Sequence, residues 1–232
     1  MANEKILVVD DEKEIADLVE IHLAGDGFKV LKAYNAAEGL DILSREDVKL
    51  VLLDIMMPGM DGLEMCRRIR ENNNIPIIMI SAKSSELDKI VGLSQGADDY
   101  VTKPFSPLEL TARVKSQLRR YTQLNPLRKD KDSDEVSLPG LLINKKSHRV
   151  WVYEEEIKLT PIEFEILYLL ASNHGKVFST DDIFEAVWNE KAYEANNTVM
   201  VHIRRLRTKL KEDSRQEKII TTVWGVGYKI ED

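Results

Sequence analysis

Hydrophobic residues in the first half of the chain follow two alternating patterns. Short runs rich in β-branched residues recur five times, and the segments between them carry apolar residues three or four positions apart. The runs predict strands and the spaced segments predict helices. Because such alternation produces right-handed βαβ units, and almost purely apolar strands are buried on both faces, we predict an α/β doubly wound five-stranded parallel sheet. The predicted strands are Lys5–Val9, Phe28–Lys32, Leu50–Leu53, Ile75–Ile80 and Asp99–Val101.

The second half places short strands before its helices. Thr160 and Pro161 supply an N-cap and a first-turn proline for one helix, and Ser179 and Thr180 begin a second. A third helix is predicted at about Ala195–Lys211, followed by a hairpin around a glycine-bearing turn. This set of elements indicates an α+β winged helix-turn-helix fold. The three strands predicted before the helices are Leu141–Asn144, Arg149–Val152 and Glu156–Leu159.

A charged stretch without any period, QLNPLRKDKDSDEVS, separates the two patterns. It is typical of a solvated linker, and Pro126 argues against the alternative of an exposed charged helix. We therefore predict two domains, residues 1–121 and 138–232, joined by a linker at residues 122–137. A chain of 232 residues is long enough for both domains.

Composition and charge narrow the class of protein. No apolar stretch approaches the roughly 18 residues of a membrane span, no secretory signal is visible, and Cys66 has no second cysteine to pair with. We therefore expect a cytoplasmic protein with no membrane partner. The net charge of −7 argues mildly against nucleic acid, yet Ala195–Lys211 contains five basic residues and no acidic one.

Polar residues follow the predicted parallel strands at their carboxyl ends, where functional groups of such sheets gather. Asp10 and Asp11 follow the first strand, Asp54 the third, Ser81 the fourth and Lys103 the fifth. Three close carboxylates need a compensating cation, which predicts Mg²⁺ or Mn²⁺. That ion and a lysine would also neutralise a phosphoryl group, and a carboxylate could accept the group as an acyl phosphate. Taken singly, each of these residues is readily explained as a turn residue or a solvated surface residue. All five at successive strand ends, in this order, are much harder to explain in that way.

The stretches VVDDE, LLDIMMPGMDGLE, IMISA and GADDYVTKPF carry a family resemblance. They are similar to the receiver domain of two-component response regulators, which implies a flavodoxin/CheY-like fold and a sensor histidine kinase as partner. The resemblance implies Asp54 as the phosphoryl acceptor and Asp11 as a direct metal ligand. It further implies that Asp10 reaches the ion through water and that the backbone carbonyl of Met56 is another ligand.

The same resemblance implies a switch. Lys103, before a cis Pro104, would pair with the phosphoryl group, and Ser81 would turn inward to it with Tyr100 following. Met56 and Lys83 stand where receivers control water access, which predicts slow self-dephosphorylation. The alternative that these two are ordinary surface residues stays open.

Charged residues between the predicted fourth helix and the end of the fifth resemble those that join two receivers in the OmpR/PhoB subfamily. Taken alone they would be ordinary exposed charges, worth about 0–1 kcal/mol a pair. The resemblance implies a homodimer on phosphorylation. Its intermolecular pairs would be Lys89–Glu109, Asp99–Arg113 and Asp98–Arg120.

The basic helix divides its residues between two faces. Val199, Ile203, Leu206 and Leu210 form one apolar stripe, and five basic residues are predicted to lie away from it. A recognition helix in a major groove requires this division, although a solvated amphipathic helix is an alternative. The basic residues are Arg204, Arg205, Arg207, Lys209 and Lys211.

The stretches LTPIEFEILYLLASNHGKVFSTDDIFEAVW, NNTVMVHIRRLRTKLK and TVWGVGYKIE resemble the OmpR/PhoB winged helix, which implies double-stranded promoter DNA as partner. Thr222 and the hairpin Val223–Tyr228 would contact the DNA backbone or minor groove, and the loop Asn189–Glu194 would contact RNA polymerase. Trp224 stands where some members have a minor-groove arginine, so we expect its bulk to anchor the hairpin. The helix residues implied to face DNA are Thr198, Val201, His202, Arg204, Arg205 and Arg207.

These patterns predict a phosphorylation-activated transcription factor, similar to regulators of glycopeptide (vancomycin) resistance genes. It would catalyse only its own phosphorylation and slow dephosphorylation. One alternative is a phosphatase or phosphotransfer enzyme built on the same acidic pocket, although no P-loop is present. Another is an adaptor whose basic helix binds an acidic protein, which would show no steep salt dependence on DNA.

Overall fold

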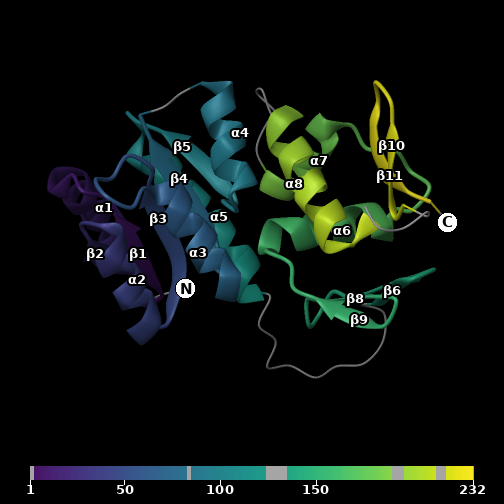
Figure 1. Ribbon diagram of the computed structural model, residues 1–232, viewed down its shortest axis with the longest axis horizontal. Coiled ribbons are helices and arrows are strands. Elements are labelled where there is room, and N and C mark those ends of the chain that lie inside the picture. Colours follow the sequence, from purple (N-terminus) through teal and green to yellow (C-terminus); the bar gives the residue numbers. More distant parts are fainter. Residues whose placement is uncertain (1–2, 83–84, 124–134, 190–195, 213–217, 232) are drawn as a thin grey trace. The chain divides into compact units, whose positions relative to one another are not determined.

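The computed structural model describes residues 3–82, 85–123, 135–189, 196–212 and 218–231. The chain divides into two compact units, Met1–Tyr121 and Thr122–Asp232 (Figure 1). No helix in the described part of the chain is both long and apolar enough to cross a membrane.

The first unit alternates strands and helices along its whole length. Its strands are all parallel and follow the order β2-β1-β3-β4-β5. This confirms the predicted doubly wound sheet, with boundaries shifted by one or two residues. The elements are β1 (Lys5–Val9), α1 (Lys13–Gly25), β2 (Lys29–Ala33), α2 (Ala36–Arg45), β3 (Val48–Asp54), α3 (Gly62–Asn72), β4 (Ile77–Ser81), α4 (Glu86–Ser94), β5 (Asp99–Thr102) and α5 (Pro107–Gln123).

Alternate residues of the sheet pack against helices on opposite faces. On one face, Ile6 and Val8 of β1 join a core that includes Val19 of α1 and Val114 of α5. On the other face, glycines allow α2 and α4 to approach closely. A Cβ at Gly39 would lie 3.1 Å from the Val9 side chain and one at Gly92 would lie 2.8 Å from Met79, so larger residues would force these helices away. Burial on both faces explains why the strands are almost wholly apolar.

In its described residues, the second unit combines two small antiparallel sheets with three α-helices. One sheet has the order β6-β7-β8-β9 and the other is the hairpin β10-β11, which confirms the predicted winged helix-turn-helix. The elements are β6 (Glu135–Leu138), β7 (Leu141–Asn144), β8 (Arg149–Val152), β9 (Glu155–Ile157), α6 (Pro161–Ser172), α7 (Thr180–Trp188), α8 (Asn196–Lys209), β10 (Ile220–Val223) and β11 (Gly227–Ile230).

Several boundaries of the second unit differ from the prediction. β6 begins at Glu135, inside the predicted linker, and α5 continues to Gln123 at its other end. β6 alternates exposed and half-buried residues, so it lacks the apolar run by which the other strands were recognised. The basic helix α8 ends at Lys209, two residues earlier than predicted, and Ala195 lies outside the described residues. The remainder of the predicted linker, residues 124–134, also lies outside them.

Local sequence signals fix the starts of α6 and α7. The Glu163 carboxylate accepts a hydrogen bond from the Thr160 amide at 2.8 Å, the reciprocal half of a capping box, as the N-cap pattern predicted. Ser179 and Asp182 form a second capping box, in which each side chain accepts from the other residue's amide at 3.0 Å. These caps place α6 and α7 where they enclose the apolar stripe of α8.

Candidate functional site: the acidic pocket and the basic helix

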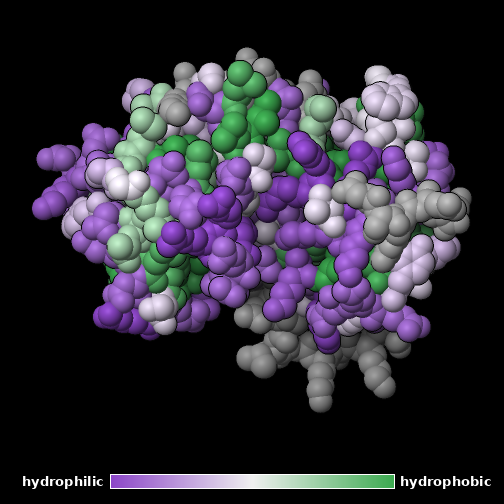
Figure 2. Space-filling view, viewed as in Figure 1, coloured by the Kyte–Doolittle hydropathy of each residue, from purple (hydrophilic) through white to green (hydrophobic). Residues whose placement is uncertain are grey.

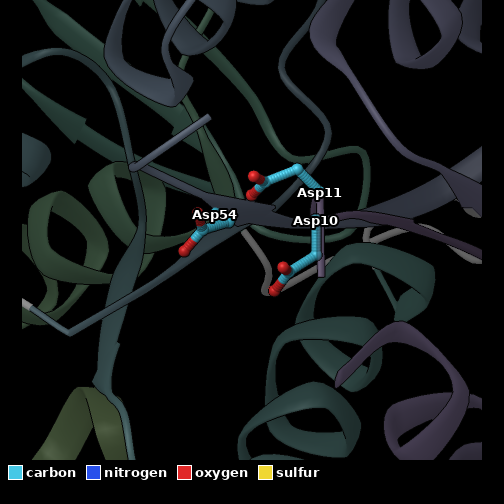
Figure 3. A group of neighbouring side chains, drawn as sticks. All are labelled: Asp10, Asp11 and Asp54. Carbon is cyan, nitrogen blue, oxygen red and sulfur yellow. The ribbon is translucent and has the colours of Figure 1, made fainter. Parts of the chain in front are cut away.

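Three aspartates meet at the carboxyl edge of the first unit's sheet. Asp10 and Asp11 follow β1, and Asp54 ends the neighbouring strand β3, at the point where the strand order reverses. One carboxylate oxygen from each lies within 4.8 Å of the others, and Figure 3 shows the three side chains side by side. The structure therefore brings together the three carboxylates that the sequence placed at this edge.

A lysine from the end of β5 completes the pocket. The Lys103 Nζ lies 2.9 Å from Asp10 Oδ2 and 3.1 Å from Asp54 Oδ1. Burial lowers the pKa of Lys103, but the hydrogen bond to Asp10 and the charges of Asp54 and Asp10 outweigh it and raise the pKa overall. Lys103 also lies 3.2 Å from Glu12 Oε1, a contact that the sequence reasoning missed. The run of three acids after β1 was the signal that could have revealed it.

Two of the aspartates are buried and one is exposed. Asp10 is 1% exposed and Asp54 3% exposed, whereas Asp11 faces solvent. Burial raises the pKa of both Asp10 and Asp54, and Lys103 opposes that rise in each case. The pocket thus holds two buried carboxylates and a largely buried lysine beside an aspartate that faces solvent.

Backbone groups hold the two buried carboxylates in place. The Glu12 amide donates to Asp10 Oδ1 at 3.0 Å, and the Met56 amide donates to Asp54 Oδ2 at 2.9 Å. The loop after Asp54 returns so closely that a Cβ at Gly62 would lie 2.1 Å from the Asp54 carbonyl oxygen. Glycine at position 62 is therefore required for this loop, which leaves the Met56 side chain exposed at the pocket.

The predicted switch residues lie beside the pocket. Ser81 ends β4 and is fully buried, and its hydroxyl shares a hydrogen bond with the hydroxyl of the buried Tyr100. Burial raises the pKa of Tyr100, and the bond to Ser81 opposes the rise. The Lys103–Pro104 peptide bond is cis, as predicted. Lys83, the second residue invoked for water access, lies outside the described residues.

Three charges predicted at a dimer surface, Asp98, Asp99 and Arg120, are buried in the single chain. Asp98 is fully buried rather than exposed, because its Oδ2 accepts from Arg70 of α3 at 2.6 Å and from the Ile77 amide at 2.9 Å. The interpretation of Asp98 as a surface charge is therefore wrong for this structure, and Arg120, its predicted partner, is also buried.

The pair Asp99–Arg113 forms inside the chain. Arg113 Nη1 lies 3.1 Å from Asp99 Oδ2, and Arg113 also contacts Glu109 one helical turn earlier at 3.1 Å. Lys89 is half-buried and the Glu109 side chain is half exposed. Figure 2 shows hydrophobic residues on the surface over α4, where Leu87 and Val91 are exposed.

The buried stripe of α8 is wider than the sequence indicated. Val199, Ile203, Leu206 and Leu210 are buried as predicted, but His202 is fully buried as well. Its ring centroid lies 5.5 Å from that of Trp188 in α7. Because α6 and α7 cover α8 from two sides, its buried face includes position 202. The interpretation that His202 faces DNA is therefore wrong.

Most basic residues of α8 are bound within their own unit. Arg205 Nη2 lies 2.9 Å from Glu163 Oε1, and Lys209 Nζ lies 2.6 Å from Glu163 Oε2. Glu163 is fully buried; burial raises its pKa, but the two cations outweigh burial and lower the pKa to about 2. Lys211 pairs with Glu155 at 2.5 Å on the surface. All five cations lie outside the buried apolar stripe, as predicted, but four of them contact groups of their own unit.

Arg207 connects α8 to the hairpin. Its Nη2 donates to the Ile220 carbonyl at 2.8 Å and to Thr222 Oγ1 at 2.7 Å. Its Nε lies 3.4 Å from the buried Glu212 carboxylate. Arg204, by contrast, is exposed, and no acid of the described residues lies within ion-pair distance of it.

The other residues predicted to contact DNA differ in exposure. Thr198, Val201 and Thr222 are half-buried. Trp224 is 90% exposed, so the expectation that it anchors the hairpin is wrong. Of the loop predicted to contact RNA polymerase, only Asn189 lies within the described residues.

Both units match known families. Residues 6–115 match the family described as "Response regulator receiver domain", and residues 154–230 match "Transcriptional regulatory protein, C terminal". Together they favour a transcriptional regulator over the phosphatase and adaptor alternatives.

Relatives and solved structures extend over nearly the whole chain. It is 50% identical over 229 residues to "Regulatory protein VanRc" of Enterococcus gallinarum and 47% identical over 230 residues to "Regulatory protein VanR" of Enterococcus faecium, with 99% of each chain covered. A solved structure of a RitR mutant matches 99% of the chain at 26% identity with a TM-score of 0.74, covering 100% of its own chain. "Response Regulator DrrB, a Thermotoga maritima OmpR/PhoB Homolog" matches 99% at 34% identity with a TM-score of 0.50, again covering 100% of its own chain. The chain therefore belongs to the OmpR/PhoB family of response regulators, in which a receiver domain, phosphorylated by a histidine kinase, activates a domain that binds promoter DNA.

Proposed function

We propose that Asp54 accepts the phosphoryl group. The observation that carries this proposal is the grouping of Asp54 with two other aspartates and Lys103 at one strand edge. In the transfer, an Asp54 carboxylate oxygen forms a bond to phosphorus while the phosphorus–nitrogen bond of the kinase's phosphohistidine breaks, and the electron pair returns to the imidazole. Lys103 would balance charge on the phosphoryl oxygens from its position between Asp10 and Asp54.

The same pocket fits a hard divalent cation such as Mg²⁺ or Mn²⁺. Its donor set consists of carboxylate oxygens close enough to share one ion, which is the chemistry these ions prefer. Asp11, Asp54 and the Met56 carbonyl would hold the ion directly, and Asp10 through water. When bound, the ion would supply positive charge that offsets the charge of the incoming phosphoryl group. The exposure of Asp11 and Met56 leaves this side of the pocket open to solvent.

Phosphorylation would reach the α4–β5–α5 face through the hydroxyl pair. A phosphoryl oxygen on Asp54 would compete with Tyr100 for the Ser81 hydroxyl, which changes the position of Tyr100 against α4. Two receivers would then associate through Lys89–Glu109 and a rearranged Asp99–Arg113 pair, as a shift in population.

For the second unit, we propose that α8 enters the major groove and that Arg204 provides its free cation. Thr198, Val201, Arg205, Arg207 and Thr222 would lie at the DNA with smaller contributions, since the two arginines already hold protein partners. The loop 189–194 would contact RNA polymerase. Given the resemblance to VanR, we also propose that the genes it controls confer glycopeptide resistance.

The test of the acceptor is phosphorylation by acetyl phosphate with Mg²⁺, followed by mass spectrometry and by measurement of dimerisation and DNA affinity. We expect the parent to gain one phosphoryl group and Asp54→Ala to gain none. Asp47→Ala, an exposed aspartate of the same unit, is the control and should behave as the parent. The proposal is wrong if the parent gains no label, or if Asp54→Ala dimerises and binds DNA as tightly as the phosphorylated parent.

A further inference from the structure

A buried carboxylate lies just beyond the end of α8. The Lys211 amide donates to the Thr208 carbonyl at 3.0 Å, and Lys211 itself has the left-handed φ of +59° that often ends a helix. Glu212 follows this turn and is only 3% exposed. Its Oε1 accepts a hydrogen bond from the Ile220 amide of β10 at 2.9 Å. Glu212 therefore connects the end of α8 to the first strand of the hairpin.

The other oxygen of the same carboxylate faces a cation. Glu212 Oε2 lies 3.4 Å from Arg207 Nε, and neither atom makes a hydrogen bond within the described residues. Arg207 Nη2 donates to the Ile220 carbonyl at 2.8 Å and to Thr222 Oγ1 at 2.7 Å. Nε and Nη2 are thus directed to groups of their own unit. Nη1 has no hydrogen-bond partner among the described residues, and the Arg207 side chain is 27% exposed.

A carboxylate in this position lowers the stability of the unit. Burial raises the pKa of Glu212, and the Ile220 amide and the charge of Arg207 oppose that rise without cancelling it. When the pKa is higher in the folded chain than in the unfolded one, the ionised group lowers the free energy of unfolding at neutral pH. A glutamine could accept the same amide hydrogen bond without this cost. The charge of Glu212 is therefore better explained by its effect on Arg207 than by stability.

We propose that Glu212 is a positioning residue, which orients Arg207 so that Nη1 and the Thr222 hydroxyl together bind one phosphate of DNA beside α8. This rests on the proposed binding of α8 to DNA. Thr222 accepts from Arg207 and keeps its own proton, so both groups can donate to one anion. A guanidinium that is already fixed on one side loses less conformational entropy on binding than a free one. Such a contact would fix the position of α8 on the duplex without reading bases.

Simple charge repulsion predicts the opposite effect of Glu212. A negative charge close to DNA repels phosphate, so its removal should tighten binding and steepen the dependence of affinity on salt. If Glu212 instead orients Arg207, its removal should weaken binding, because the guanidinium loses the partner that holds its Nε. The direction of the change in affinity therefore distinguishes the two effects.

The experiment uses the full chain treated with acetyl phosphate and duplexes selected from a random-sequence pool by the parent. We expect Glu212→Gln to weaken binding about fivefold. The slope of log affinity against log salt should become shallower by up to about one, because one ordered phosphate contact is lost. Urea unfolding of the second unit should be unchanged or shifted to slightly higher urea, because the buried charge is gone. The control is Glu231→Gln, which removes an exposed acid paired with Lys229 and should not weaken binding.

A double variant tests whether Glu212 acts through Arg207. Arg207→Ala should weaken binding about tenfold, and Glu212→Gln added to it should cause no further loss. Unchanged or tighter binding by Glu212→Gln, or additive effects in the double variant, would overturn the proposal. A loss of stability large enough to explain the weaker binding would also overturn it, because Glu212 would then be purely structural. If Arg204→Ala, measured alongside, leaves DNA binding unchanged, the error lies in the proposed function of α8 instead.

Discussion

The acidic pocket and the basic helix differ in whether their charged residues are paired within the chain or open to a ligand. In the pocket, Lys103 lies among three acids at an open edge of the sheet, and Asp11 still faces solvent. In the helix, Arg205 and Lys209 both bind the buried Glu163, and Arg207 binds the hairpin. The pocket thus keeps its charges available for a ligand, whereas the helix uses most of its charges to fix its own position. Arg204 remains as the exposed exception.

The difference shows that a cluster of like charges in sequence does not define a binding face. A side chain at the end of a strand lies at the edge of the sheet, whatever residues surround it. The position of the pocket therefore follows from the topology of the sheet. A helix residue points outward or inward according to what packs on each side. Glu163, 46 positions before Lys209, decides the role of two of the four cations on this helix. The comparison can be tested by removing charges from each region.

Removing the Glu163 charge should have the largest effect. Glu163→Gln would leave Arg205 and Lys209 without their shared acid inside the unit, and breaking a buried ion pair typically costs about 3–5 kcal/mol. Because Lys209 is partly exposed, we expect the free energy of unfolding of the second unit to fall by about 3 kcal/mol. Urea unfolding followed by tryptophan fluorescence reports this unit selectively, since all three tryptophans lie in it.

The control is Glu155→Gln, which removes the acid that Lys211 contacts on the surface. That pair is about half exposed, so its loss should change stability by less than about 1 kcal/mol. Equal effects of the two variants would contradict the view that α8 is positioned by a buried charge.

The pH dependence of the free energy of unfolding should show the contribution of the Glu163 charge. The pKa of Glu163 is lowered from 4.5 to about 2 in the folded chain, so its stabilisation is complete above pH 4.5 and is lost as the pH falls through about 2. At about 1.4 kcal/mol for each pKa unit, the difference amounts to about 3 kcal/mol. Between pH 5 and pH 2 the parent should therefore lose about that much more stability than Glu163→Gln. If the stability of the parent and that of Glu163→Gln fall in parallel with pH, Glu163 is not ionised in the folded chain.

Two adjacent arginines separate the roles within the helix itself. Arg204→Ala should weaken DNA binding by about 1–3 kcal/mol and leave stability unchanged, because its side chain is exposed. Arg205→Ala should lower stability and weaken binding mainly through that loss, because it holds Glu163. DNA affinity and urea unfolding measured on both variants give a two-by-two comparison. The reverse pattern would restore the interpretation that Arg205 is free to face DNA.

The sequence predicts the features that follow from the order of strands and helices. It misses the positions of side chains whose partners lie far away in the sequence. Strand ends were placed within two residues, and this sufficed to bring the three aspartates and Lys103 together. His202 and Asp98 were misplaced because their partners, Trp188 and Arg70, lie in other elements and leave no local pattern. β6 was missed because its half-buried residues show no apolar run. Trp224 was expected to anchor the hairpin on account of its size, yet its side chain is 90% exposed.

The smallest expected effect concerns Glu12, the acid at the pocket that the sequence reasoning passed over. It shares Lys103 with Asp10 and Asp54, but its side chain is 60% exposed, so its ion pair should be screened and worth less than about 1 kcal/mol. Glu12→Gln removes a negative charge from the path of an anionic donor and releases Lys103 toward Asp54. We therefore expect the rate of phosphorylation by acetyl phosphate to rise by no more than about threefold, with stability unchanged, whereas Asp10→Asn should slow it severely because Asp10 is buried against Lys103. A severe loss of phosphorylation in Glu12→Gln would instead make Glu12 part of the reacting centre, and the pocket would then extend one residue further along the chain than its three aspartates.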